Sequence, residues 1–184
     1  MKKRRQGGFT LIELALVMGI SALVASGLIG MFNAHIQMVN QASKFKFLAQ
    51  DAPIIGLLLT RTIGNAEDYR IYATGPDARS PNGTPVLKGQ AVRLWMRQPN
   101  NTFRQAVVSF ETPTSGPFSG HSGIYFFLAK SDGTFSEKPD WQLAASSPVS
   151  LGGATFAFDP VTGILLVTLN GSYYEQYTFA AEKK

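Results

Sequence analysis

The chain has 184 residues, no cysteine, and 17 Lys and Arg against 12 Asp and Glu, which gives a formal net charge of +5. Four of the basic residues lie at positions 2–5, so the other thirteen nearly balance the acids, and they are scattered along the chain. This distribution argues against the basic patch that nucleic-acid binding requires, and the lack of cysteine excludes a disulfide-stapled fold. The length allows one domain of about 120–150 residues behind an anchor.

The first predicted element is an apolar segment, residues 9–32, which follows closely on the basic residues. As a helix rising about 1.5 Å per residue, it reaches about 36 Å, which exceeds the roughly 30 Å hydrocarbon core of a bilayer. The positive-inside rule places the N-terminus in the cytoplasm and the rest of the chain across the membrane. Glu13 is the exception in this segment. Because a carboxylate is costly in an apolar span, Glu13 indicates a functional site.

Residues 8–13, with the sequence Gly-Phe-Thr-Leu-Ile-Glu after a short basic leader, resemble the class III signal of type IV prepilins and pseudopilins. The resemblance implies that prepilin peptidase cleaves between Gly8 and Phe9 on the cytoplasmic side and N-methylates Phe9. It also implies that the apolar helix stays on the mature subunit, lies in membrane lipid before assembly, and then packs with other pilins in a filament core. In such a filament, the Glu13 carboxylate is expected to face the charged N-terminal amine of Phe9 on a neighbouring subunit.

The alternative interpretation of this segment is an ordinary secretory signal peptide or a plain signal anchor. In a signal peptide, Val24, Ala25 and Ser26 would supply the small-residue cleavage site. The acid inside the apolar run, and a length above the usual stretch of about 7–15 residues, both favour the prepilin interpretation. Many major pilins close a C-terminal loop with a disulfide, so the lack of cysteine favours a minor pilin or pseudopilin.

The helix is expected to continue over residues 33–63, because apolar residues recur there at spacings of three and four. The predicted stripe consists of Phe32, Ile36, Val39, Ala42, Phe45, Leu48/Ala49, Ala52, Ile55, Leu59 and Ile63. We expect this stripe to pack on the body of the protein, with a surface for a partner helix as the alternative. Pro53 is expected to kink or restart the helix, with Asp51 as the candidate N-cap.

Residues 64–184 are expected to form a β-rich body, because the apolar period changes after Gly64. Strands are predicted around residues 69–72, 86–96, 103–110, 123–129, 154–158, 164–169 and 173–179. Turn signals separate them at residues 75–85, 99–101, 131–133, 159–163 and 170–171, the last being an Asn-Gly pair.

The sequence therefore predicts an α+β fold, in which a long helix lies on a mainly antiparallel sheet. Its four segments are a cleaved leader (1–8), a membrane or filament-core helix (9–32), an amphipathic continuation (33–63) and an extracytoplasmic body (64–184). This order is similar to that of J-type minor pseudopilins and related larger minor pilins.

Candidate chemical groups in the body are sparse. His35 and His121 have no neighbouring ligand pattern, so each is expected to be solvated. Asp132, Asp140 and Asp159 are candidate oxygen ligands for Ca²⁺, although their spacing fits no EF-hand loop, and turn or capping roles are the alternative. Five aromatic residues are candidates for contact with sister subunits or cargo, with core filling as the alternative: Trp95, Phe118, Trp141, Tyr173 and Tyr174.

These patterns favour a structural subunit, a minor pilin or pseudopilin of a type IV pilus or a type II secretion filament. Its expected partners are prepilin peptidase, other pilins, the inner-membrane assembly platform and membrane lipid, but not nucleic acid. We expect a single-pass inner-membrane protein with a periplasmic or extracellular body, no cofactor and no enzymatic activity of its own. The alternatives are a filament-borne adhesive or ligand-binding module and, with less support, a membrane-anchored enzyme.

Overall fold

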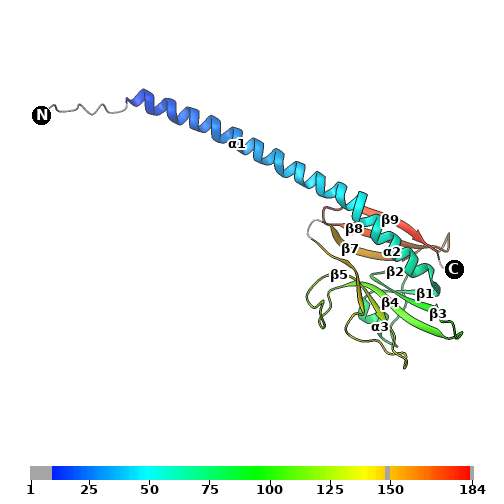
Figure 1. The fold of residues 1–184 in the computed structure, drawn as a ribbon. Helices are drawn as coiled ribbons and strands as arrows, with labels where there is room; N and C mark the ends of the chain where they lie inside the picture. The colour runs from blue at the N-terminus through cyan, green and yellow to red at the C-terminus, as the bar shows by residue number, and fades with distance from the viewer. Residues whose placement is uncertain (1–9, 148–149, 183–184) are drawn as a thin grey trace. The chain divides into compact units, whose positions relative to one another are not determined.

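The computed structural model describes residues 10–147 and 150–182, and the chain forms two compact units, Met1–Ala42 and Ser43–Lys184. Helix α1 (Leu11–Lys46) is followed directly by a π-helical turn, η1 (Phe47–Asp51), and by helix α2 (Ala52–Gly64). The strands come after these helical segments in the chain (Figure 1). The predicted end of the helix near residue 63 is confirmed.

The junction between α1 and α2 differs from the prediction. The Ala52 N–H donates to the Phe47 carbonyl, which is the i→i+5 bond of a π-turn, and Pro53 lies in the first turn of α2. Because proline lacks an N–H and crowds the carbonyl four residues earlier, the wider turn accommodates it without breaking the helix. Asp51 makes no N-cap bond, so that prediction is wrong. Its carboxylate instead accepts a hydrogen bond from Ser150 Oγ at 2.5 Å.

The extra residue in the π-turn also changes which face of the helix is buried. Ala52, Ile55, Leu59 and Ile63 are buried as predicted, but the preceding core residue is Phe47, which is 1% exposed. Phe45, assigned to the stripe on a regular period, is 72% exposed, and Phe32, Ile36 and Val39 are also exposed. Only the second half of the predicted stripe therefore packs on the body.

The body contains two antiparallel sheets. The five-stranded sheet has the order β1 (Ala66–Tyr72), β3 (Ala91–Arg97), β4 (Phe103–Glu111), β5 (Gly123–Leu128) and β6 (Trp141–Ala145). The four-stranded sheet has the order β2 (Lys88–Gly89), β7 (Leu151–Phe158), β8 (Leu165–Gly171) and β9 (Gln176–Ala181). The α+β fold class is confirmed, with a sheet that is divided in two.

One hydrophobic core joins α2 to both sheets, and a second, smaller cluster covers the opposite face of the five-stranded sheet. Residues of both clusters alternate along β3, β4 and β5, for example Val107 and Val108. These strands are therefore buried on both faces, which explains their continuous apolar runs.

The body differs from the predictions in three places. The loop predicted at 75–85 contains a short helix, α3 (Gly75–Arg79), capped by Thr74, and the strand β6 was not predicted. The strand predicted over 86–96 is divided at Gln90, between β2 and β3, which belong to different sheets. A Cβ at Gly89 would lie 1.9 Å from the Tyr72 carbonyl oxygen, so the close approach of β2 to the end of β1 requires glycine at this position.

The Asn-Gly pair at 170–171 ends β8 and does not form the turn itself. The turn runs through residues 172–174, closed by a 2.7 Å bond from the Gly171 N–H to the Glu175 carbonyl, with Tyr174 at a φ of 69°. A Cβ at Gly171 would lie 2.3 Å from Glu175 Oε2 and 2.8 Å from Phe47 Cδ1. This glycine therefore serves the close approach of the buried Phe47 ring.

Candidate functional site: the N-terminal helix

Helix α1 begins with a capping box formed by Thr10 and Glu13. Glu13 Oε2 accepts hydrogen bonds from the Thr10 N–H and from Thr10 Oγ1, both at 2.9 Å, and the Glu13 N–H donates to Thr10 Oγ1 at 3.3 Å. This reciprocal pairing satisfies backbone groups that the first helical turn leaves open. The Thr-x-x-Glu spacing is a recognised signal for such a box. Thr10 is thus a residue of the site that could have been predicted from the sequence but was not.

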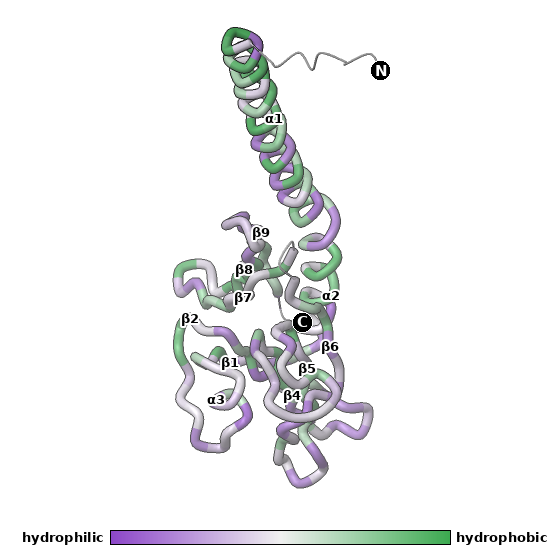
Figure 2. The backbone as a smooth tube through the Cα atoms, turned by 90° about the vertical axis from the view of Figure 1, so that its left-hand side faces the viewer, coloured by the Kyte–Doolittle hydropathy of each residue, from purple (hydrophilic) through white to green (hydrophobic). Residues whose placement is uncertain are grey.

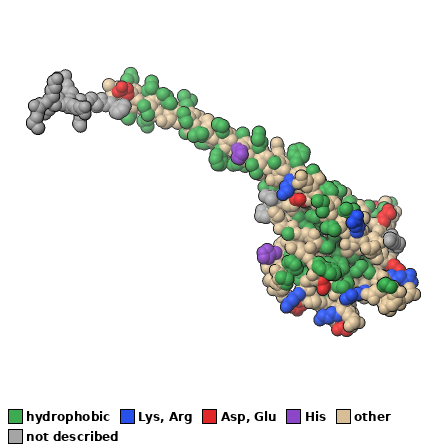
Figure 3. All heavy atoms as spheres, viewed as in Figure 1, with side chains coloured by type: hydrophobic (Ala, Val, Ile, Leu, Met, Phe, Trp, Pro, Cys, Tyr) green, Lys and Arg blue, Asp and Glu red, His purple; other side chains and the backbone are tan. Residues whose placement is uncertain are grey.

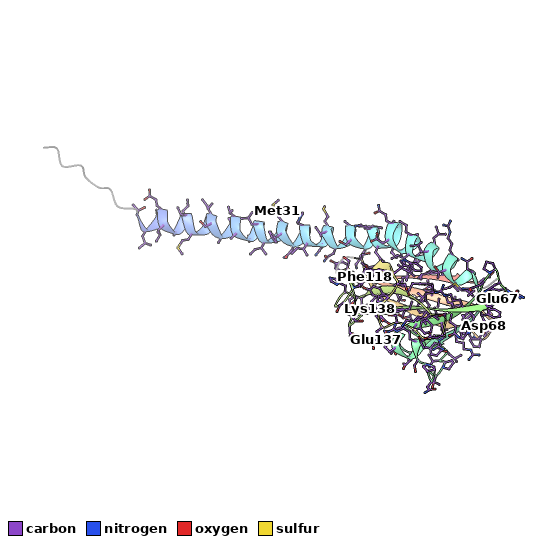
Figure 4. The ribbon with its side chains drawn as sticks, turned by 60° about the horizontal axis from the view of Figure 1, so that its bottom comes forward. Met31, Glu67, Asp68, Phe118, Glu137 and Lys138 are labelled. Atoms are coloured by element: carbon purple, nitrogen blue, oxygen red, sulfur yellow. The ribbon has the colours of Figure 1, made fainter. Side chains whose placement is uncertain are left out.

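The remainder of α1 combines an apolar surface with an absence of charge. No Asp, Glu, Lys or Arg occurs between Glu13 and Lys44, and none of the α1 residues is buried. Hydrophobic residues dominate the first half of the helix, and hydrophilic ones become more frequent along the second (Figure 2). Hydrophobic side chains lie along both sides of α1 in the space-filling view (Figure 3), and Met31 projects from it (Figure 4).

This surface needs an apolar environment from outside the chain. The continuous helical stretch Leu11–Gly64 is long and apolar enough to cross a membrane. Cβ atoms built at Gly19, Gly27 and Gly30 would meet nothing within 4 Å, so these glycines leave room for close approach. Lipid tails or other apolar helices supply such surroundings.

The predicted cleavage and methylation site, Gly8 and Phe9, lies outside the described residues and stays a prediction. The charge pairing of Glu13 with a neighbouring subunit also stays a prediction, because the Glu13 bonds described above are all made within its own chain. The geometry adds that Glu13 has a local structural role before any neighbour is present.

The three aspartates weighed as calcium ligands each accept hydrogen bonds from a different segment of the body. Asp132 caps its own turn through the Thr134 N–H and hydroxyl, Asp140 accepts from the Leu128 N–H, and Asp159 accepts from the Val161 N–H and from the Thr162 hydroxyl. The Thr162 and Val161 hydrogen bonds lower the pKa of Asp159, and those from Thr134 lower the pKa of Asp132. Within the described residues, no group of three or more His, Cys, Asp or Glu side chains gathers.

The five candidate aromatics differ in their surroundings. Tyr174 is 97% exposed at the tip of the β8–β9 turn, and its neighbour Tyr173 is half-buried, with its N–H donating to Glu175 Oε2 at 3.0 Å. Trp141 is 58% exposed, with its ring 5.3 Å from that of Phe126. Phe118 packs on Tyr125, and Trp95 lies under the Arg70 guanidinium. His121, in the same loop as Phe118, contacts the Ser119 carbonyl through Nδ1. These residues do not form one surface cluster.

A buried polar network holds α3 against the five-stranded sheet. Arg79 pairs with Glu111 at 2.9 Å and lies over the Phe127 ring, and Arg93 donates to the carbonyls of Ala78 and Ser80 at 2.6 Å each. These hydrogen-bond partners are up to 32 residues apart in the chain, so no local pattern in the sequence predicts their pairing. We interpret the network as structural, because its donors and acceptors satisfy one another.

Comparison with known proteins identifies the N-terminal segment of the chain. Residues 3–29 match the family described as the prokaryotic N-terminal methylation motif, the signal of type IV pilin-like precursors. No curated protein and no solved structure matched the chain significantly. The match covers most of the leader, the capping box and residues 11–29 of α1. It therefore indicates a precursor of the pilin or pseudopilin type and leaves the body unassigned.

Proposed function

We propose that the protein is a minor pilin or pseudopilin, a structural subunit of a type IV pilus or a type II secretion filament. One observation carries the proposal: the methylation motif lies at the start of a helix whose apolar surface has no partner within the described chain. A helix of this kind is stable only in lipid or among other apolar helices. A filament subunit uses both environments in turn.

Processing is the first step of the proposed function. Prepilin peptidase cleaves between Gly8 and Phe9 and methylates the new amine of Phe9. The basic residues at positions 2–5 hold this end in the cytoplasm, and the body crosses to the periplasmic side of the inner membrane. The leader (1–8), the membrane helix (9–32), its continuation (33–63) and the body (64–184) are the proposed segments.

Assembly is the second step, and it takes place at an inner-membrane platform together with other pilins. The mature N-terminal amine of one subunit and the Glu13 carboxylate of its neighbour carry opposite charges, which attract strongly where water is excluded. Since Glu13 is held by Thr10 in the free subunit, the incoming amine adds to or replaces the capping bonds. This arrangement makes the favourable contact dependent on the register of the two helices.

A minor subunit fits the chain better than a major one. The body contains no cysteine and so lacks the disulfide-closed loop of many major pilins. The order of the long helix, five-stranded sheet and late β7–β8–β9 meander supports the proposed likeness to J-type minor pseudopilins and larger minor pilins.

The test is to express the full chain together with the genes of a native filament system, with and without active prepilin peptidase. We expect the processed chain in sheared filaments, or cross-linked to other pilins, only when the peptidase is active. Recovery of a fully processed chain that never accompanies filaments or other pilins would overturn the proposal.

A further inference from the structure

Strand β9 forms one edge of the four-stranded sheet, and its outer side is open. It pairs with β8 in the register Tyr177–Leu169 and Phe179–Val167. The Gly171 N–H bonds to the Glu175 carbonyl, and in an antiparallel ladder the hydrogen-bonded pairs alternate. Tyr177 and Phe179 therefore direct their backbone groups toward β8. Gln176, Thr178 and Ala180 direct theirs outward, where no backbone partner lies within the described residues.

The sequence of β9 lacks the features that normally protect a sheet edge. Its six residues, Gln-Tyr-Thr-Phe-Ala-Ala, include no charge, no proline and no glycine. The other edges differ: β1 carries Glu67, Asp68 and Arg70, β2 has only two residues, and the pairing of β6 is interrupted by a bulge. Glu67 and Asp68 are labelled on the body in Figure 4. Among the edges of the two described sheets, β9 is thus the one suited to strand pairing.

A groove adjoins this edge. Its volume is about 640 Å³, and it is lined by Thr60, Arg61 and Gly64 of α2, by Asn65, and by Ala180 and Glu182 at the end of β9. The inner face of β9 is already occupied, because the Tyr177 and Phe179 rings pack close to Gly56 of α2. The groove therefore leaves space beside the C-terminal end of β9, next to the outward backbone groups of Ala180.

We propose that β9 is a docking edge for an extended segment of a neighbouring subunit, which adds a fifth strand to this sheet. The inference rests on the proposed filament function. The three outward N–H and three outward C=O groups match the backbone of an extended peptide better than they match any other common partner. Successive subunits of a filament meet through different surfaces, whereas pairing of β9 with β9 of a second copy would close a dimer. The occupant is therefore a strand from another part of a neighbouring subunit.

Amide hydrogen exchange tests this pairing directly. The full chain in detergent micelles is compared with the same chain in sheared filaments, with exchange quenched and read at single residues. The Thr178 and Ala180 amides should exchange at least about tenfold more slowly in the filament, whereas the Tyr177 and Phe179 amides, already bonded to β8, are the internal controls. Unchanged exchange at Thr178 and Ala180 would overturn the inference. Protection of both amides in micelles of the chain alone would also overturn it, in favour of a second copy.

A pair of variants supplies an independent measurement. Thr178→Pro removes one outward N–H without removing a bond to β8, and Thr178→Val keeps that N–H while removing the hydroxyl. We expect both to be processed, and only Thr178→Pro to show a several-fold lower recovery in filaments. Equal recovery of the two variants would contradict the inference. Absence of the unmodified chain from filaments would instead mean that the proposed function has failed. If Thr178→Pro is misfolded, the exchange measurement alone decides.

Discussion

At the scale of single residues, the Thr10–Glu13 pair separates two roles of one carboxylate, helix capping and charge pairing. Glu13→Gln removes the charge but keeps a side chain that can complete a capping box, whereas Thr10→Val breaks the box and keeps the charge. We expect Glu13→Gln and Glu13→Leu to be inserted and cleaved normally but to be depleted from filaments, and Thr10→Val to be incorporated at closer to the native level. The measurement is the ratio of filament-bound to processed chain for each variant.

The opposite ranking, with Thr10→Val depleted and Glu13→Gln incorporated normally, would assign Glu13 to capping alone. Normal incorporation of all three variants would mean that neither role sets the subunit register.

A second residue-scale prediction concerns acid stability. Hydrogen bonds from Thr162 and Val161 lower the pKa of Asp159 below its ordinary value near 3.8. A group with a depressed folded pKa stabilises the fold above its unfolded pKa, and this contribution is lost as the pH falls through the folded pKa. Asp159→Asn should therefore lower Tm slightly at neutral pH and have a smaller effect on Tm at acidic pH. Thermal scans from about pH 2 to pH 6 measure this; a difference that stays constant over the range would contradict it.

At the scale of elements, the π-turn η1 determines which aromatic ring anchors the helix to the body. Phe47 is buried and Phe45 is exposed, although the two are separated by one residue. Phe47→Ala should lower the free energy of unfolding of the body by about 3–5 kcal/mol. Phe45→Ala, the matched control, should change it by no more than about 0.5 kcal/mol. Denaturant unfolding of the full chain in detergent gives both values, and equal losses would contradict the π-turn.

Elements that depend on local sequence patterns could be predicted from the sequence. Features that depend on pairing between residues distant in the chain could not. The apolar helix, most strands, and the β3–β4 and β7–β8 hairpins were predicted correctly, since each depends on periodicity or on a turn signal. Phe47 was missed because a π-turn shifts the helical phase by one residue without a composition signal of its own. The division into two sheets depends on pairings such as Lys88 with Ala157, which no local pattern specifies.

The candidate site could be predicted in part, because some of its features depend on local sequence patterns. Glu13 was identified from its contrast with an apolar run, and the capping box was available from the Thr-x-x-Glu spacing. The open edge at β9 was not predictable, because the order of strands decides which of them is outermost.

At the scale of the whole molecule, two parts of the chain meet different requirements. The N-terminal segment needs an apolar environment from outside, whereas the body supplies its own core from α2 and two sheets. The methylation motif belongs to the first part, and the open edge of β9 belongs to the second. We therefore expect both the N-terminal helix and the β9 edge of the body to hold a subunit in the filament.

The central claim is that this chain is a prepilin-type precursor, and the mass of its mature N-terminal peptide tests that claim most directly. The full chain is expressed in a host with active prepilin peptidase, purified from membranes, and digested for mass spectrometry. We expect a mature chain that begins at Phe9 and carries one N-methyl group, with no such peptide in a host lacking the peptidase. A mature chain beginning near Gly27, after the small residues Val24, Ala25 and Ser26, would contradict it.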